Sequence, residues 1–120
     1  ISGSIAHDSH NIIAVGTNDS DILNALNTLI DLKGGMVASE GKDTRSVRLD
    51  VAGLMSNKKG EDLLSEYKYL SDFTKSFGSD FHSPFMTLAF MSLLVIPKLK
   101  LSDKGLFDVE QFKLIDLYCE

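Results

Sequence analysis

The feature that most restricts the fold is an apolar segment, residues 85–94, that lies between two prolines. Ser83 supplies a capping hydroxyl and Pro84 suits the first helical position, so the sequence predicts a helix that begins here. Pro97 stops it. Apolar side chains occur almost all round this segment, whereas a helix at the surface carries polar residues on one face. We therefore expect residues 85–94 to form a buried helix.

Earlier in the chain, a strand followed by a helix is predicted. Residues 12–16 are apolar and rich in β-branched side chains, which is typical of a buried strand. Residues 17–20 include several side chains that can cap a helix, and Gly34 with Gly35 can supply the left-handed conformation that helix ends often need. The helix between them is indicated by apolar residues at helical spacing: Ile22, Leu26, Leu29 and Ile30.

The central part of the sequence predicts a hairpin and a second helix. Residues 36–38 and 46–51 are strand candidates joined through residues 40–43, and the second strand alternates between apolar and polar side chains, as a strand with one buried face does. Gly78 ends the helix that follows. The inward residues of the second strand are Val47, Leu49 and Val51, and the helix stripe is Leu63, Tyr67, Leu70, Thr74 and Phe77, widened by Leu64 and Phe73.

The end of the chain predicts more strands, and the order of elements then defines the fold class. Residues 98–101 alternate as a strand, residues 102–105 form a turn, and residues 112–118 are a last strand candidate. This order predicts an α+β fold in which a mixed or antiparallel β-sheet packs with about three helices. With 120 residues, 43% of them hydrophobic and 24% charged, we expect a single globular domain, residues 1–120.

Charge and cysteine content restrict the partners and the compartment. The net charge is −5 and the densest basic group is Lys58 with Lys59, so nucleic acid and an anionic membrane are disfavoured. The longest apolar run, residues 88–97, is far shorter than the roughly 20 residues that span a bilayer, and the first residues do not resemble a signal sequence. Cys119 is the only cysteine. We expect it to be incidental, and the protein to be cytoplasmic.

The side chains best suited to catalysis or ligand binding precede the first predicted strand. They are His7, Asp8, Ser9, His10 and Asn11. Two imidazoles, a carboxylate and a carboxamide supply metal ligands, acid–base groups and hydrogen bonds. Three interpretations stay open: a structural loop that bonds to backbone, a loop that faces a ligand, and a self-sufficient metal site. A triad of Ser9, His10 and Asp8 is disfavoured, because neighbours in sequence do not readily place a base between nucleophile and carboxylate.

Four segments, residues 3–19, 52–56, 80–90 and 95–109, resemble the C-terminal region of adenine deaminases. They occur in the order of that family and cover nearly the whole chain. The motif Gly3-Ser-Ile-Ala-His-Asp-Ser-His-Asn11 is the most distinctive of them. The sequence is therefore identified as similar to the adenine deaminase C-terminal domain, within the metal-dependent amidohydrolase superfamily.

The resemblance implies a hydrolase of purine salvage in which adenine and water give hypoxanthine and ammonia, with Mn²⁺ or Fe²⁺ in the full-length enzyme. It also implies an upstream (β/α)8 barrel in the same polypeptide and a homo-oligomer. The barrel's metal ligands begin with a His-x-His motif, which is absent here. We therefore expect no metal ligand and no catalytic residue in this chain, which should be inactive by itself.

The resemblance leaves two main hypotheses for the domain. In the first, residues 7–11 help to complete or cover the barrel's active site, where His10 or Asp8 bonds the purine or excludes water. In the second, the domain is a structural or oligomerisation module that docks through the helix at residues 85–94. A third hypothesis is a free-standing domain that binds a small ligand.

Overall fold

A computed structural model of the protein describes residues 1–7 and 10–118. That part of the chain contains three helices and seven strands, and the strands form two antiparallel sheets with the orders β2-β1-β3-β4 and β5-β6-β7. The predicted α+β fold is confirmed. The elements are β1 (Ser2–Gly3), β2 (Ile13–Ala14), α1 (Asp19–Leu32), β3 (Gly35–Glu40), β4 (Asp43–Arg48), α2 (Gly60–Ser76), α3 (Pro84–Met91), β5 (Leu99–Ser102), β6 (Gly105–Asp108) and β7 (Lys113–Ile115).

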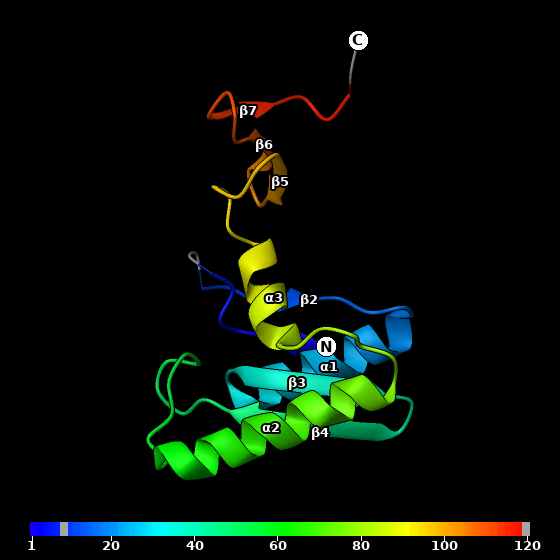
Figure 1. The fold of residues 1–120 in the computed structure, drawn as a ribbon. Coiled ribbons are helices and arrows are strands. Elements are labelled where there is room, and N and C mark those ends of the chain that lie inside the picture. The colour runs from blue at the N-terminus through cyan, green and yellow to red at the C-terminus, as the bar shows by residue number, and fades with distance from the viewer. Residues whose placement is uncertain (8–9, 119–120) are drawn as a thin grey trace.

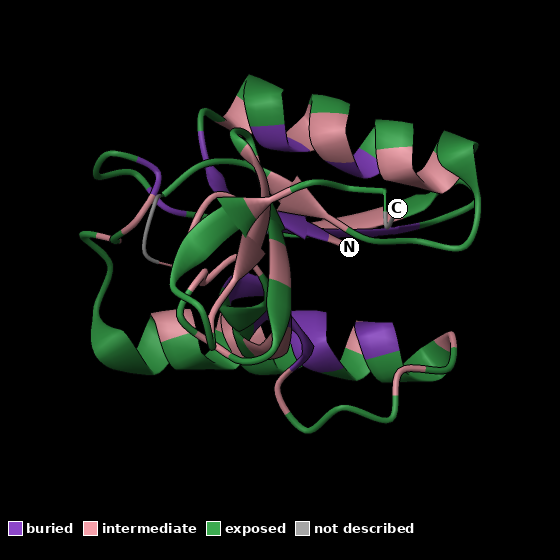
Figure 2. Ribbon diagram, turned by 90° about the horizontal axis from the view of Figure 1, so that it is seen from above, coloured by how far each residue is buried: buried purple, intermediate pink, exposed green. Residues whose placement is uncertain are grey.

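The core lies on both faces of the first sheet, because α1 covers one face and α2 with α3 covers the other (Figures 1 and 2). Val37 of β3 packs with Ala25 and Leu29 of α1. Successive residues of a strand point to opposite faces. Because helices cover both faces of this sheet, all residues of β3 except the last are buried. The cluster on the other face consists of Met36, Ala38, Val47, Leu70 and Phe85.

Helix α1 has the predicted N-terminal cap but a different C-terminal one. The side chain of Asn18 accepts a hydrogen bond from the backbone N–H of Asp21 at 2.9 Å. At the other end, Lys33 takes the left-handed conformation, with φ 61°. The prediction that Gly34 and Gly35 supply this conformation was therefore wrong. Their φ angles, 117° and 142°, allow instead a close approach of other backbone segments.

The predicted hairpin is confirmed, with β3 and β4 paired from Gly35 opposite Arg48 to Glu40 opposite Asp43. Gly41 stands first in the two-residue turn with φ 58°, which fits a type II′ turn. The prediction that Val51 faces the interior was wrong, since its side chain is 41% exposed. The chain has left the sheet after β4, and Val51 forms an isolated bridge with Met55 instead.

Helix α2 follows the predicted stripe. Leu70 and Thr74 are fully buried against the sheet, and Phe77 packs at the edge of the same cluster. Leu64, which was expected to widen the stripe, is 67% exposed. Gly78, with φ 102°, follows the end of the helix as predicted.

Helix α3 starts at Pro84 as predicted but is buried on one side only. Met86 and Met91 are each 56% exposed, because no described element covers the outer side of the helix. The hydroxyl of Ser83 makes no capping bond in the described structure; it lies 3.3 Å from Nδ1 of His82. The helix also ends at Met91, before residue 94. No helix among the described residues is both long enough and apolar enough to cross a membrane.

The strand predicted for residues 12–16 is short and half-exposed instead of buried. Its regular part is β2, and the flanking Ile12 and Val15 are 48% and 53% exposed. The reason is its position: β2 is the outermost strand of its sheet, next to β1. An edge strand with little covering it leaves its apolar side chains at the surface.

The second sheet projects beyond α3, away from the first (Figure 1). Its strand β5 was predicted, and β7 lies within the predicted residues 112–118. Strand β6 was not predicted. None of the residues of these three strands, all of which the structure describes, is buried.

The first prediction concerns Gly34. A Cβ at this position would clash with the Cα of Gly53 and lie 3.1 Å from Oγ of Ser4, so Gly34→Ala should lower the free energy of unfolding by about 2–4 kcal/mol. Gly60→Ala is the control, because a Cβ there meets no heavy atom within 4 Å. It should be neutral or stabilising by up to about 1 kcal/mol. Urea denaturation followed by circular dichroism measures both; equal stability of the two variants would contradict the close approach.

The second prediction concerns the residues at the N-terminal ends of α1 and α3. Asn18→Ala removes a bonded cap and should destabilise the protein by about 1 kcal/mol. Ser83→Ala removes a hydroxyl that caps nothing in the described structure and should change stability by less than about 0.5 kcal/mol. The same denaturation experiment compares them, and an equal loss in both variants would show that Ser83 caps α3 after all.

Candidate functional site

The polar segment at residues 7–11 is positioned by the chain that enters it. In β1 the hydroxyl of Ser2 donates a hydrogen bond to the carbonyl of Ala25 at 3.1 Å. The hydroxyl of Ser4 then accepts from the N–H of Gly35 at 2.8 Å and donates to the carbonyl of Gly53. These bonds fix the direction in which the chain leaves the sheet toward the segment.

The base of the segment is held by the C-terminal end of α3. The N–H of His7 donates to the carbonyl of Ala89 at 3.0 Å. The hydroxyl of Ser92 is shared between two carbonyl acceptors, that of His7 at 2.9 Å and that of Ala89 at 2.8 Å. The ring of His7 also packs edge-on against Phe90, with centroids 5.1 Å apart. His7 is therefore an anchoring residue whose backbone and ring are both engaged by α3.

The other described residues of the segment present their side chains outward. His10 has φ 50°, and its N–H donates to the carbonyl of Ala6 at 2.7 Å, which closes a tight turn. The side chains of His10 and Asn11 are exposed. Asp8 and Ser9 lie outside the described residues. The segment thus has an anchored base, formed by Ala6 and His7, and an exposed side at His10 and Asn11.

A cavity of about 520 Å³ lies beside the segment, between the end of α3, β2 and the turn of the second sheet. Asn11 and Asp103 are the residues with carboxamide and carboxylate groups in its lining, and the rest is mostly aliphatic. Such a volume is in the range of small-molecule sites, but the lining offers few polar groups to orient a ligand. The lining residues are Asn11, Ile12, Ile13, Met91, Ser92, Leu93, Leu94, Val95, Leu101, Ser102 and Asp103.

The described residues do not offer a ligand set for a metal ion. Within residues 1–7 and 10–118 no group of three or more His, Cys, Asp or Glu side chains comes together. His82, the third imidazole of the chain, lies in the loop before α3, next to Ser83. Cys119 lies outside the described residues. A metal centre built by this part of the chain is therefore not supported.

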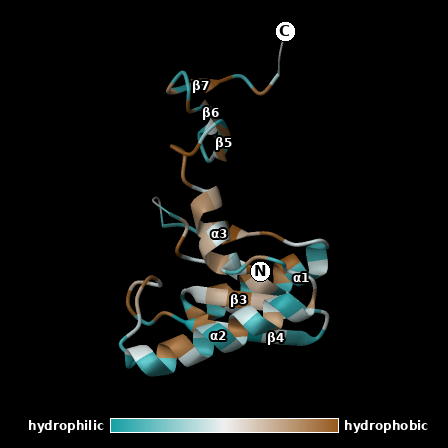
Figure 3. Ribbon diagram, viewed as in Figure 1, coloured by the Kyte–Doolittle hydropathy of each residue, from teal (hydrophilic) through white to brown (hydrophobic). Residues whose placement is uncertain are grey.

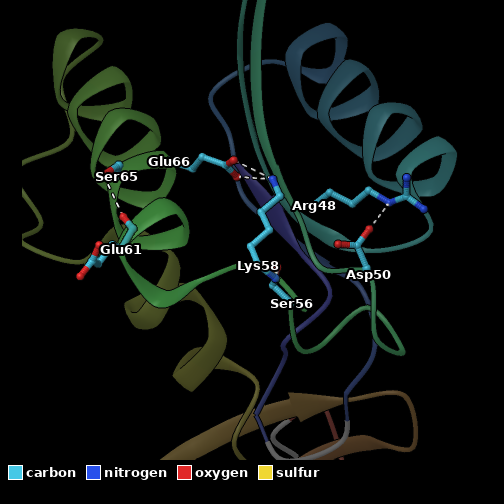
Figure 4. Close-up of polar contacts among 7 residues, drawn as sticks. All are labelled: Arg48, Asp50, Ser56, Lys58, Glu61, Ser65 and Glu66. Atoms are coloured by element: carbon cyan, nitrogen blue, oxygen red, sulfur yellow. Dashed lines mark hydrogen bonds and ion pairs between the residues drawn. The ribbon is translucent and has the colours of Figure 1, made fainter.

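A second loop, residues 49–59, is tied to the same framework and contains residues 52–56, one of the four segments in which the sequence resembles the family. Ala52 and Gly53 have φ 55° and 72°, and Gly53 contacts Gly34 and Ser4. Two ion pairs border it, Arg48 with Asp50 at 3.1 Å and Lys58 with Glu66 at 2.6 Å (Figure 4). Both pairs are partly exposed, so each contributes little stability.

Three residues that position the site were missed by the sequence analysis: Ser4, Phe90 and Ser92. Ser92 and His7 are 85 residues apart in sequence, and no local pattern reports such a contact. The pair Gly34-Gly35 was a usable signal for Ser4, since a glycine pair after a helix permits close backbone approach as well as a left-handed cap.

Comparison of the sequence with known proteins places the chain in one family. Residues 1–113 match the model of the adenine deaminase C-terminal domain, and the chain belongs to that family. It is 53% identical over 120 residues to an adenine deaminase of Methanosarcina acetivorans and 49% identical over 117 residues to one of Borreliella burgdorferi. A further adenine deaminase, from a Sulfurovum species, is 50% identical over 117 residues. The chain spans only 21–22% of the length of these relatives.

The anchored base generates the third prediction. Ser92→Ala removes the bond to the carbonyl of His7, worth about 1 kcal/mol, so the backbone amides of His7 and His10 should exchange about fivefold faster with solvent. Ser76→Ala is the control, because its hydroxyl donates to the carbonyl of Phe73 in the same helix at 2.7 Å. Hydrogen exchange read by NMR measures both. Unchanged exchange at His7 and His10 would show that Ser92 does not hold the segment.

Proposed function

We propose that this chain is the C-terminal domain of an adenine deaminase, and that the full-length protein hydrolyses adenine to hypoxanthine and ammonia. The observation that carries the proposal is the 53% identity over all 120 residues to a protein named adenine deaminase. The reaction belongs to purine metabolism. We place the protein in the cytoplasm, because a single cysteine forms no disulfide within this chain, as suits a reducing compartment.

The metal of the full-length enzyme, Mn²⁺ or Fe²⁺ in our proposal, is assigned to the upstream part of the polypeptide. The described residues do not fit it, since they bring together no set of three ligands. Such an ion would supply Lewis-acid activation of water, held by residues of that upstream part. No catalytic residue of this chain is assigned to that step.

Within that enzyme, we propose that residues 7–11 reach the edge of the active site. The described geometry supports this role because the base of the segment is fixed by α3, whereas the side chains of His10 and Asn11 are exposed. A carboxamide offers a donor and an acceptor that match the N6 and N7 edge of adenine, and an imidazole can donate to or accept from the purine. Asp8 and Ser9 stay candidates for contact with substrate.

A second role, a structural or oligomerisation module, is favoured by a different observation. Large apolar side chains are exposed along α3 and the second sheet. The two roles are compatible, since a domain that docks through one surface can present a loop from its border.

His10 generates the fourth prediction. In the full-length enzyme, His10→Ala should lower kcat/KM for adenine about 10- to 100-fold, the usual cost of a lost hydrogen bond to substrate or transition state. His82→Ala removes an exposed imidazole from a separate loop and should leave kcat/KM unchanged. Steady-state kinetics with a circular dichroism check on folding make the comparison. Wild-type kinetics in the folded His10→Ala variant would remove His10 from the site.

A further inference from the structure

The second sheet lacks a core of its own. By the pairing register, one face carries Leu99, Leu101 and Leu106, and Ile115 joins them from β7. Asp108 and Lys113 lie at one end of the same face. None of the residues in β5–β7 is buried in the described structure. A small sheet needs a hydrophobic face packed against something else to be stable. This largely aliphatic face therefore requires a cover that the described part of the chain does not supply.

The outer side of α3 has the same character. Residues 83–97 contain no charged side chain, and Figure 3 shows α3 as the most uniformly hydrophobic of the helices. Pro84, Phe85, Leu88 and Ala89 are buried on the inner side. Met86 and Phe90 are exposed on the other side, and Met91 is exposed at the end of the helix. A solvent-facing helix surface normally carries charge, so this one is built for contact with protein.

The two apolar surfaces are continuous. Met91 at the end of α3, Val95 after it and Leu101 of β5 all line the cavity of about 520 Å³. The combined surface, called here the docking surface, is formed by residues that are 37–71% exposed: Met86, Phe90, Met91, Val95, Leu99 and Leu101.

The chain exposes more surface than a folded monomer of its mass is expected to expose, as it would if another body covered part of it. A folded monomer of this mass is expected to expose about 6,400 Å², whereas this chain exposes 8155 Å². Its radius of gyration is 15.5 Å, against about 13.6 Å for an ordinary domain of this length. The excess of about 1,700 Å² is twice the roughly 800 Å² that each partner buries in a standard protein–protein interface.

We propose that the docking surface is covered by the upstream part of the same polypeptide. The relatives are between four and five times as long as this chain, which spans 22% of the first of them, so enough polypeptide exists to bury such an area. The proposed role of the polar segment at the edge of the active site favours this occupant over a second copy. His7 packs on Phe90 of the docking surface, so a body seated there lies directly beside His10 and Asn11. Two copies would also bring two charges of −5 together.

The inference rests on the proposed function for its occupant. Its test uses structural readouts, so it can fail while the hydrolysis of adenine is retained. In the full-length protein, Met86→Glu and Leu101→Glu each place a charge in the docking surface. Leu64→Glu is the matched control, because Leu64 is 67% exposed on α2 and lies outside the docking surface. Hydrogen exchange of the amides in β5–β7 and analytical ultracentrifugation are measured for all three variants.

We expect Met86→Glu and Leu101→Glu to raise the exchange rates in β5–β7 about tenfold or more, because burying an unpaired charge opens the contact. Leu64→Glu should leave them at the wild-type values, and the effect should persist at protein concentrations where the enzyme is monomeric. Equal exchange in all three variants would overturn the proposal. Dissociation of an oligomer without change in the exchange of the monomer would assign the docking surface to a second copy, and would overturn it as well.

Discussion

The arrangement of the whole first sheet depends on one crossing of backbone segments at Ser4. Its hydroxyl joins the N–H of Gly35 to the carbonyl of Gly53, and Gly34 approaches Gly53 too closely for any side chain. One serine thus connects the end of β1, the start of β3 and the loop after β4. Because β1 continues into the polar segment, the same contact also sets where that segment leaves the fold.

The elements that sequence predicted well are those specified by neighbours along the chain. Asn18 caps α1 because its side chain reaches an amide three residues on, and Gly41 suits a two-residue turn through its own φ. The stripe of α2 was recognisable because Leu70 and Thr74 recur at the helical period and face one sheet. Local patterns of this kind require no knowledge of distant residues.

The features that sequence did not predict depend on what covers each surface. The apolar residues of α3 indicated burial, but only contact with another body could bury Met86 and Met91, and hydrophobicity alone does not say where that body is. Strand β2 was expected to be buried, but it lies at the edge of its sheet, and its hydrophobicity alone did not reveal that position. In the candidate site, the capable side chains were recognisable from the sequence. The contact between Ser92 and His7, which positions them, joins residues 85 positions apart.

The place of the docking surface late in the chain has a consequence for biosynthesis. A ribosome makes the polypeptide from its N-terminus, and domains generally fold as they emerge. An upstream partner would therefore already be folded when α3 and the second sheet leave the exit tunnel. The segment without charge at residues 83–97, which would promote aggregation if it waited in solvent, would meet its covering surface almost at once.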